Sequence, residues 1–505
     1  WRSLNRLNIA NLTFAALCFG LAVITKWAYT VMFLTWLILA LVRILSPSPL
    51  IVTLSGSAEI GSRWKKAGVL FGLLASMLII AYGFVLSAYG FRYFAIPGGA
   101  MRLPMDQQLP LFGFARSLIE FVTRTHFFPE AWTYGQLDIF RQLGRDTYLL
   151  GENRIGAGFW LYFPIAFVVK TPLPTLLIIV AGLGFFIYER NKRPTGALLL
   201  VPVIVYFGLA VWSGMNIGLR HVLPIYPFLF VLAGGAAAKL WQRENGVLRG
   251  VLMTGGGWLL VSVFTIFPNY LSFFNELIGG PRNGHKVLLD SNLDWGQDLK
   301  GLRRWLDIQG AQKIQFLYFG IYSAVVPRYY GIDAVFLPGS WVGTNDLVQA
   351  DQALPNYVAI SVNHLYGYFR RTGDEEFVKP FRELKPMATI GESIWIYEMG
   401  QAIEQYRRLA LANPTSAESQ YRLANLMSHQ GMTTGALDHY KRALELAPGF
   451  AAGHDKFAIA LAKVNLIEEA IIHWRKVLEL PPLNNRFETL SRLGTTLAMS
   501  GRFSE

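Results

Sequence analysis

Long apolar segments alternate with short polar ones through the first half of the chain. A helix that crosses a bilayer needs about 20 mostly apolar residues. Seven segments meet this requirement: roughly 9–25, 27–45, 67–90, 161–188, 196–213, 222–240 and 249–267. The pattern therefore predicts an α-helical transmembrane bundle over residues 1–267, with one long connecting loop at 91–160.

Positive charges gather in every second loop of this predicted bundle. One set of loops holds Arg43, Arg63, Lys65, Lys66, Arg190, Lys192, Arg193, Lys239, Arg243 and Arg249. The short loops on the other side hold only Lys26 and Arg220. Because cytoplasmic loops are enriched in lysine and arginine, we expect the first set to face the cytoplasm. Lys26, the loop 91–160, Arg220 and everything after residue 268 are then extracytoplasmic.

The long loop contains an amphipathic stretch, LFGFARSLIEFVTRTHFF. Apolar side chains recur at helical spacing, and charged ones lie between them: Leu111, Phe114, Leu118 and Val122, with Arg116, Glu120 and Arg124. Such a pattern is typical of a helix lying on the membrane surface. A re-entrant helix that only packs within the bundle is an equally open interpretation.

The pattern changes between residues 285 and 400. Short runs with strand character follow one another, HKVLLD, KIQFLYFG, NYVAIS and IWIYEM, with a helical stretch around 297–308 and Pro/Gly turns between them. This alternation predicts a small extracytoplasmic α/β domain over residues 268–400.

The last hundred residues repeat with a period of 34. The recurring positions are Ala402, Ala436 and Ala470; Tyr406, Tyr440 and Trp474; Pro414, Pro448 and Pro482; and Ala424 with Ala458. Small residues where helices cross, an aromatic four positions later and a terminating proline resemble the tetratricopeptide (TPR) repeat. We therefore expect an α-solenoid TPR tail over 401–505, which binds a protein or peptide partner in its groove.

Composition agrees with a membrane protein. Hydrophobic residues make up 53% of the 505 residues, and the formal net charge is +13. Residues 1–267 hold 22 Lys+Arg against 9 Asp+Glu, and the remainder holds 24 of each. Because a nucleic-acid binder concentrates its cations on a soluble surface, this distribution argues against nucleic-acid binding. The single cysteine, Cys18, excludes a disulfide framework and a thiolate metal site.

The sequence begins with Trp1 and its last repeat stops at Glu505, so we expect a fragment of a longer protein.

Ionisable groups at the membrane border are candidates for function because burying them there is costly. Lys26, Lys170, Arg220 and His221 all fall on the predicted extracytoplasmic side. An arginine fork and a lysine can hold the phosphate of a lipid-linked donor. Lys26 and Lys170 can equally extend to lipid headgroups. Arg220 favours function, since it lies in a short loop that orientation rules would leave uncharged.

Three aspartates follow the membrane region in LLDSNLDWGQDLKGL. Asp290, Asp294 and Asp298 are four residues apart and would share one face of a helix. They could bind a cation or exchange protons, but helix capping by Asn292 or Asp294 with a solvated Asp298 is the simpler interpretation. The sequence contains no zincin spacing, GxSxG elbow or GK[ST] phosphate loop, so neither a metal nor another cofactor is expected.

Four runs together carry a family resemblance: GLAVITKWAYT, YFPIAFVVKTPLP, IGLRHVLPIYPF and NYLSFFNELIGGPRNGHKVLLDSNLDWGQDL. Over most of residues 9–400 the chain resembles bacterial membrane glycosyltransferases of the GT-C type. The similar branch is family 39, which is related to protein O-mannosyltransferases and aminoarabinose lipid A transferases. Attached TPR repeats also look like an architecture of this group.

The resemblance implies transfer of a sugar from a polyprenyl-phosphate carrier to an extracytoplasmic acceptor, with inversion. It implies donor-binding cations at Arg220, Lys170 and His221, in that order. The family's carboxylate base lies in a loop upstream of GLAVITK, so the resemblance assigns no catalytic residue within this sequence. The alternatives are a non-catalytic membrane-anchored TPR scaffold and a transporter, the latter disfavoured because inverted repeats are not evident.

Overall fold

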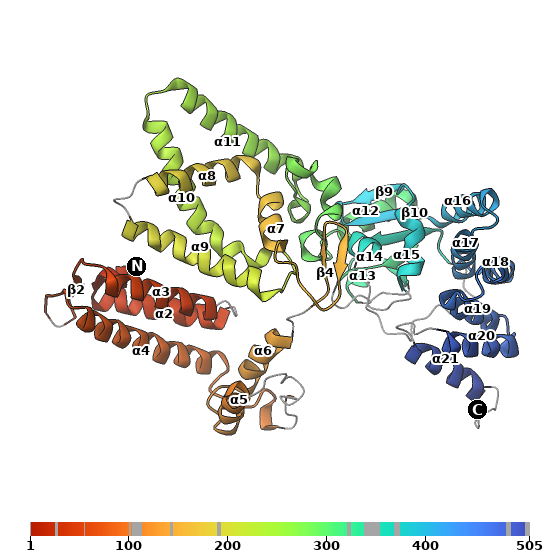
Figure 1. Cartoon of the computed structure of the whole chain (residues 1–505), viewed down its shortest axis with the longest axis horizontal. Helices are drawn as coiled ribbons and strands as arrows, with labels where there is room; N and C mark the ends of the chain where they lie inside the picture. The colour runs from red at the N-terminus through yellow and green to blue at the C-terminus, as the bar shows by residue number, and fades with distance from the viewer. Residues whose placement is uncertain are drawn as a thin grey trace. The chain divides into compact units, whose positions relative to one another are not determined.

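The computed structural model describes residues 2–25, 29–54, 56–99, 103, 114–141, 145–188, 193–320, 325–337, 354–367, 374–480 and 486–499. The chain is mostly helical and forms two compact units (Figure 1). The first comprises Trp1–Thr147 and Arg154–Ser262, and the second comprises Tyr148–Asn153 and Val263–Glu505. The division between the units falls close to the predicted boundary at 267.

Apolar helices make up most of the first unit. They are α2 (Ile9–Thr25), α3 (Tyr29–Leu45), α4 (Arg63–Ala88), α7 (Tyr162–Lys170), α8 (Leu173–Tyr188), α9 (Arg193–Ser213), α10 (Tyr226–Gln242) and α11 (Gly246–Ile266). Helix α2 packs on α4, α3 on α9, and α8 on α10. A short helix α1 (Arg2–Asn5) and a three-stranded sheet, β1 (Arg6–Leu7), β2 (Leu50–Val52) and β3 (Ala58–Ile60), complete one end. Helices therefore occur at all the predicted apolar segments.

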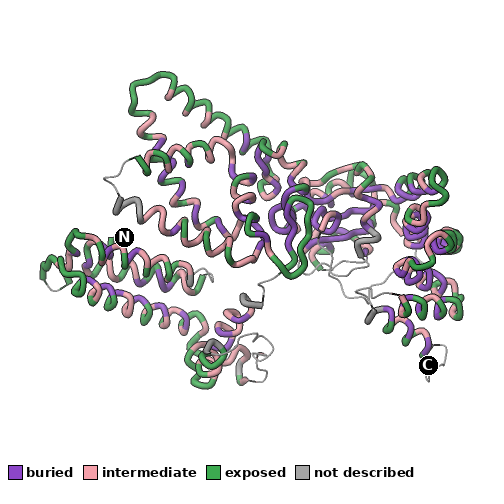
Figure 2. The backbone as a smooth tube through the Cα atoms, in the orientation of Figure 1, coloured by how far each residue is buried: buried purple, intermediate pink, exposed green. Residues whose placement is uncertain are grey.

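Within the described residues, three continuous helical stretches are long and apolar enough to cross a membrane: Arg63–Ala88, Leu223–Gln242 and Gly246–Ile266. The helices over Ile9–Thr25, Val31–Leu45 and Leu198–Ser213 are apolar but shorter. Figure 2 shows α11 exposed along most of its length. Only 6% of its most apolar stretch is buried inside the protein. Contact with lipid would require large apolar side chains on the outer surface, and α11 has them: Phe264, for example, is 73% exposed.

The predicted single span 161–188 is instead two helices that meet at an angle of 114°. Helix α7 ends at Lys170, and Thr171 adopts an extended backbone with ψ 131°. Pro172 explains the break, because a proline disfavours the helical conformation of the residue before it and donates no backbone hydrogen bond.

The long loop is largely structured. It contains α5 (Phe114–Arg124), α6 (Glu130–Arg141) and the hairpin β4 (Thr147–Leu149) and β5 (Glu152–Arg154). The predicted amphipathic helix is present as α5, where Arg116 pairs with Glu120 at 3.0 Å. Leu111 lies outside the described residues. Attachment of α5 to a membrane surface stays a prediction.

A five-stranded sheet forms the centre of the second unit. Its strands are β6 (Lys313–Leu317), β7 (Asp333–Phe336), β8 (Tyr357–Ser361), β9 (Ala388–Ile390) and β10 (Ile394–Glu398), in the order β7-β6-β8-β10-β9. The pairs β6–β7 and β6–β8 are parallel, and the others are antiparallel. Four helices accompany the sheet: α12 (Leu299–Gln309), α13 (Val325–Tyr329), α14 (Val362–Tyr366) and α15 (Asp374–Arg382). The predicted mixture of strands and helices is confirmed.

The first predicted strand, HKVLLD, is wrong. The segment instead contains the 3-10 helices η8 (Pro281–Lys286) and η9 (Asp290–Asn292), and Asp290 has a left-handed φ of 60°. Leu288 and Leu289 are fully buried, and the β4–β5 hairpin contacts the segment where the backbone N–H of Leu150 donates to the oxygen of Val287 at 3.0 Å. A continuous apolar run indicates burial, which a coil can provide as well as a strand.

Six helices follow the sheet: α16 (Met399–Ala412), α17 (Ala417–His429), α18 (Thr433–Leu446), α19 (Ala451–Lys463), α20 (Ile467–Glu479) and α21 (Arg486–Met499). Each packs on the next one in the chain. The 34-residue alanine positions Ala402, Ala436 and Ala470 are all completely buried. One hydrophobic core continues from the sheet, through residues such as Val358, into these helices. Pro482 lies outside the described residues.

Candidate functional site

Arg220 and His221 lie in a compact turn between two apolar helices. Helix α9 ends at Ser213, and the 3-10 turns η4 (Leu219–His221) and η5 (Leu223–Ile225) lead into α10. Gly214 and Gly218 have φ of 63° and 131°, values that favour glycine and let the backbone reverse direction here. Both Arg220 and His221 are half-buried. The turn fixes their backbone close to the helix ends.

Helix α7, which ends in Lys170, is tied to the segment that carries this turn. At its start, the backbone N–H of Phe159 donates to Oδ1 of Asn216 at 2.7 Å. At its end, the hydroxyls of Thr171 and Tyr226 are 2.6 Å apart. Helix α7 also packs directly on η4. The structure thus places α7, which ends in Lys170, against η4, which contains Arg220 and His221. Lys26 lies outside the described residues.

Two residues that sequence reasoning missed hold the start of α7 in place. Asn216 is only 2% exposed. A Cβ at Gly158 would lie 2.5 Å from both Oδ1 of Asn216 and the backbone oxygen of Gly214, so only glycine fits. The sequence did contain a signal for Asn216: it is a polar residue within the apolar run GMNIGL. A buried side-chain amide needs a hydrogen-bond partner, so such a residue is expected to join two segments.

In the second unit, the three aspartates do not share a helix face. Asp290 belongs to η9, Asp294 to the following loop, and Asp298 immediately precedes α12. The predicted capping role is also wrong: Asn292 donates to the oxygen of Leu289, and Asp298 is 7% exposed rather than solvated. The reason is the non-helical course of residues 290–298, which turns these carboxylates into the protein.

Asp294 and Asp298 each accept one hydrogen bond from a distant serine hydroxyl and one from a neighbouring amide. Asp294 accepts bonds from the Ser361 hydroxyl and, at 2.8 Å, from the backbone N–H of Gly296. Asp298 accepts bonds from Ser393 Oγ at 2.6 Å and from Gln297 Nε2 at 3.0 Å.

Both carboxylates are harder to ionise than an ordinary aspartate. Burial raises the pKa of Asp294 to about 7, although the hydrogen bond from Ser361 opposes this. Burial also raises the pKa of Asp298, against hydrogen bonds from Ser393 and Gln297. A carboxyl group that titrates near neutral pH can donate or accept a proton, so Asp294 has the acidity of an acid/base group.

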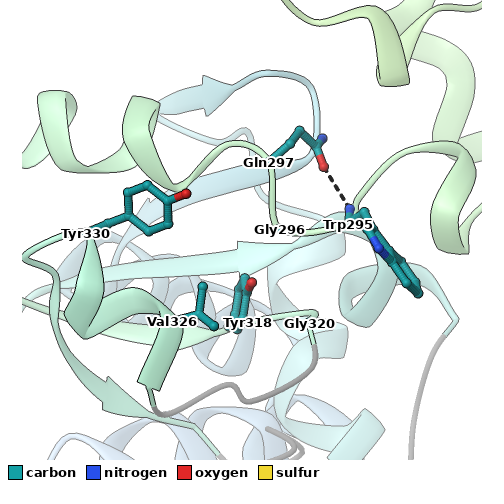
Figure 3. A pocket seen from close by; sticks show the side chains of 7 residues that line it. All are labelled: Trp295, Gly296, Gln297, Tyr318, Gly320, Val326 and Tyr330. Atoms are coloured by element: carbon teal, nitrogen blue, oxygen red, sulfur yellow. Dashed lines mark hydrogen bonds between the residues drawn. The ribbon is translucent and has the colours of Figure 1, made fainter. Parts of the chain in front are cut away.

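A pocket of about 370 Å³ begins at Trp295, the residue that follows Asp294 in the chain. Figure 3 shows the residues that line it. It is lined by Trp295, Gly296, Gln297, Tyr318, Gly320, Val326 and Tyr330. Sequence reasoning missed this pocket because its lining comes from three separated segments. Among the described residues, no group of three or more His, Cys, Asp or Glu side chains could hold a metal ion.

In comparisons with known proteins, neither a protein-family model nor a curated protein matches the chain.

Proposed function

We propose that this protein is a membrane glycosyltransferase that transfers a sugar from a polyprenyl-phosphate donor to an acceptor on the extracytoplasmic face. In this proposal the first unit is a multi-pass GT-C-like bundle. Arg220, Lys170 and His221 bind the donor phosphate. No residue is assigned as the catalytic base.

The observation that supports this proposal most is the attachment of α7 to the segment 214–226. Two hydrogen bonds, one from Phe159 to Asn216 and one between Thr171 and Tyr226, fix the helix at both ends. Lys170 is therefore held on an element that packs against the turn of Arg220 and His221. Cations on two fixed elements can stabilise a departing phosphate without reorganising during the reaction.

The apolar surroundings strengthen such an interaction. The three membrane-length stretches place apolar surface on the same unit as these cations. A charge-assisted hydrogen bond to a phosphate oxygen is strongest where water is scarce, and an arginine can form two in parallel. A prenyl chain would lie against the apolar helices while its phosphate reaches the turn.

The helices α16–α21 support a second element of the proposal. Their sequential packing and the buried alanines at a 34-residue period agree with a TPR array. We propose that this array binds a protein or peptide, either the acceptor or an assembly partner.

Photolabelling should locate the donor phosphate. A farnesyl phosphate that carries a benzophenone near its phosphate should label peptides 159–171 and 214–226, because both segments border the proposed site. Mass spectrometry of the digested membrane protein would identify the labelled peptides. Excess farnesyl phosphate should remove the label and farnesol should not, since only the former has the anion. Labelling confined to α2–α4 would contradict the site.

Thiol labelling should establish the orientation. In a Cys18→Ser background, Asn413→Cys lies in an exposed turn between α16 and α17, and Gln242→Cys lies at the exposed end of α10. In right-side-out vesicles, a membrane-impermeant maleimide should label Asn413→Cys at once and Gln242→Cys only after permeabilisation. The reverse order would exclude an extracytoplasmic tail.

A non-catalytic, membrane-anchored TPR scaffold is the alternative. The shared hydrophobic core of the sheet and the helices α16–α21 favours it, because it makes a rigid platform for a partner. Such a scaffold has no need of a prenyl phosphate. Absence of specific photolabelling, together with extracytoplasmic Asn413→Cys, would therefore favour the scaffold over the enzyme.

A further inference from the structure

The strand order of the second unit creates a place where ligands commonly bind. Strands β6, β7 and β8 are parallel, so their carboxyl ends lie at one edge of the sheet. The chain passes from β6 to β7 on one side, and β8 then pairs with the other side of β6. The connection after β6 leads to β7 on one side, and the connection after β8 leads to β9 and β10 on the other, so the chain leaves the neighbouring parallel strands β6 and β8 in opposite directions. In open α/β sheets, the crevice outside such a switch point is the usual ligand site.

The pocket lies at this edge. Tyr318 and Gly320 follow the last residue of β6, and Ser361, the last residue of β8, bonds to Asp294 beside the pocket. The two strand ends are joined where His364 Nε2 lies 3.2 Å from the backbone oxygen of Tyr318. The loop at Trp295–Gln297 and helix α13 supply the other walls. Topology and cavity, two independent features, thus coincide.

Two tyrosine hydroxyls, those of Tyr318 and Tyr330, belong to the lining of the pocket. Tyr318 is 3% exposed, and within the part of the chain that the structure describes neither its hydroxyl nor that of Tyr330 bonds to another group. Figure 3 shows the Tyr330 hydroxyl directed toward the Gly296–Gln297 backbone, with Tyr318 and Val326 on the facing wall. Both residues line the pocket, so a ligand there can donate a hydrogen bond to each hydroxyl or accept one from it.

The remaining lining disfavours an anionic ligand. The seven lining residues include no charged side chain, so an anion would find no counter-charge among them. Three are aromatic, and Trp295 remains 47% exposed. Gln297 keeps an acceptor lone pair on Oε1 beyond its bond from the backbone N–H of Trp295. The complementary ligand has apolar faces and several neutral hydroxyl groups.

We propose that this pocket binds a neutral saccharide. The C–H faces of a sugar ring pack on aromatic rings, while its hydroxyls bond to the two tyrosine hydroxyls and to Gln297. The volume of about 370 Å³ lies within the range of about 300–1,000 Å³ common for small-molecule sites. This site belongs wholly to the second unit. It does not depend on the donor site around Arg220 or on glycosyl transfer.

Saturation-transfer NMR tests this site on the whole protein, in a detergent without a sugar headgroup. The probes are D-glucose, D-mannose and N-acetyl-D-glucosamine. We expect at least one to bind, and Tyr330→Phe to weaken its binding about five- to tenfold, because one neutral hydrogen bond is lost. The matched control is Tyr329→Phe, which removes the same atom from the neighbouring residue outside the pocket, 84% exposed. The affinity of the Tyr329→Phe variant for the sugar should differ less than twofold from that of the unchanged protein.

Charge provides the second arm of the test. D-Glucuronate matches glucose in size but carries an anion, and we expect it to bind more weakly than glucose or not at all. The proposal is overturned if none of the three neutral sugars binds, if Tyr330→Phe and Tyr329→Phe bind equally well, or if glucuronate binds more tightly than glucose. Trp295→Ala should also lower the affinity for the sugar. Trp295 is half-exposed, so its replacement disturbs folding less than replacement of the buried Tyr318 would.

Discussion

Arg220→Ala should lower sugar transfer from a polyprenyl-phosphate donor at least a hundredfold in membranes that contain the protein. The guanidinium is proposed to hold the phosphate as negative charge develops on it. Removal of one preorganised donor to a developing oxyanion costs about 2.7–4 kcal/mol, which corresponds to a factor of about 100 to 1,000 in rate. Transfer would be measured as radiolabelled sugar that passes from the lipid fraction to the acceptor fraction.

Two further variants make this result specific. Arg220→Lys keeps the charge but loses the planar fork, so it should recover only part of the activity. Arg243→Ala removes an exposed arginine at the opposite end of α10 and should leave transfer unchanged. Equal amounts of protein in the membrane must be confirmed for each variant. Full activity of Arg220→Ala would remove this residue from the donor site.

Asp294→Asn should make the second unit more stable above pH 7 and change it little at pH 4. Burial raises the pKa of Asp294 to about 7 in the folded protein, from 3.8 in an ordinary aspartate. The folded state therefore binds the proton more tightly between these values. The free energy of unfolding falls as pH rises through this window, by an upper limit on the order of 4 kcal/mol. Asparagine has nearly the same shape and does not ionise, so the variant avoids this loss.

Thermal unfolding at pH 4, 6 and 8 would measure the effect, as the difference in midpoint between the variant and the wild type. The difference should grow with pH and reach its largest value at pH 8. Asp333→Asn is the matched control, because this aspartate is exposed on β7 and pairs only loosely with Lys313 at 3.7 Å. A variant that is equally destabilised at every pH would show that Asp294 acts by shape and hydrogen bonding alone.

The predicted donor-binding residues illustrate what a single sequence can and cannot give. Lys170 and Arg220 stand out because a charge within an apolar run is costly wherever it lies. Nothing in the sequence indicated that their elements pack together, since this depends on the bonds of Asn216 and Thr171 with partners 57 and 55 residues away. The bend at Thr171 was readable from Pro172, but the angle of 114° was not.

The aspartate cluster shows the opposite case. Equal spacing would place Asp290, Asp294 and Asp298 on one face only if the segment were a helix, and it is not, so the spacing carries no meaning here. Their burial follows from partners on β8 and beside β10, Ser361 and Ser393, which no local pattern identifies. The pocket beside them was missed for the same reason.

Local sequence patterns were sufficient to predict the apolar helices, most strands of the sheet and the 34-residue helical period. These follow from hydrophobic periodicity and proline positions, which act within one element or between neighbours in the chain. The fold alone revealed that β6, β7 and β8 end at one edge, that Tyr318 and Tyr330 line one pocket there, and that α7 lies against the Arg220 turn. Those arrangements depend on contacts between residues far apart in the chain, and one sequence records the residues without recording their pairing.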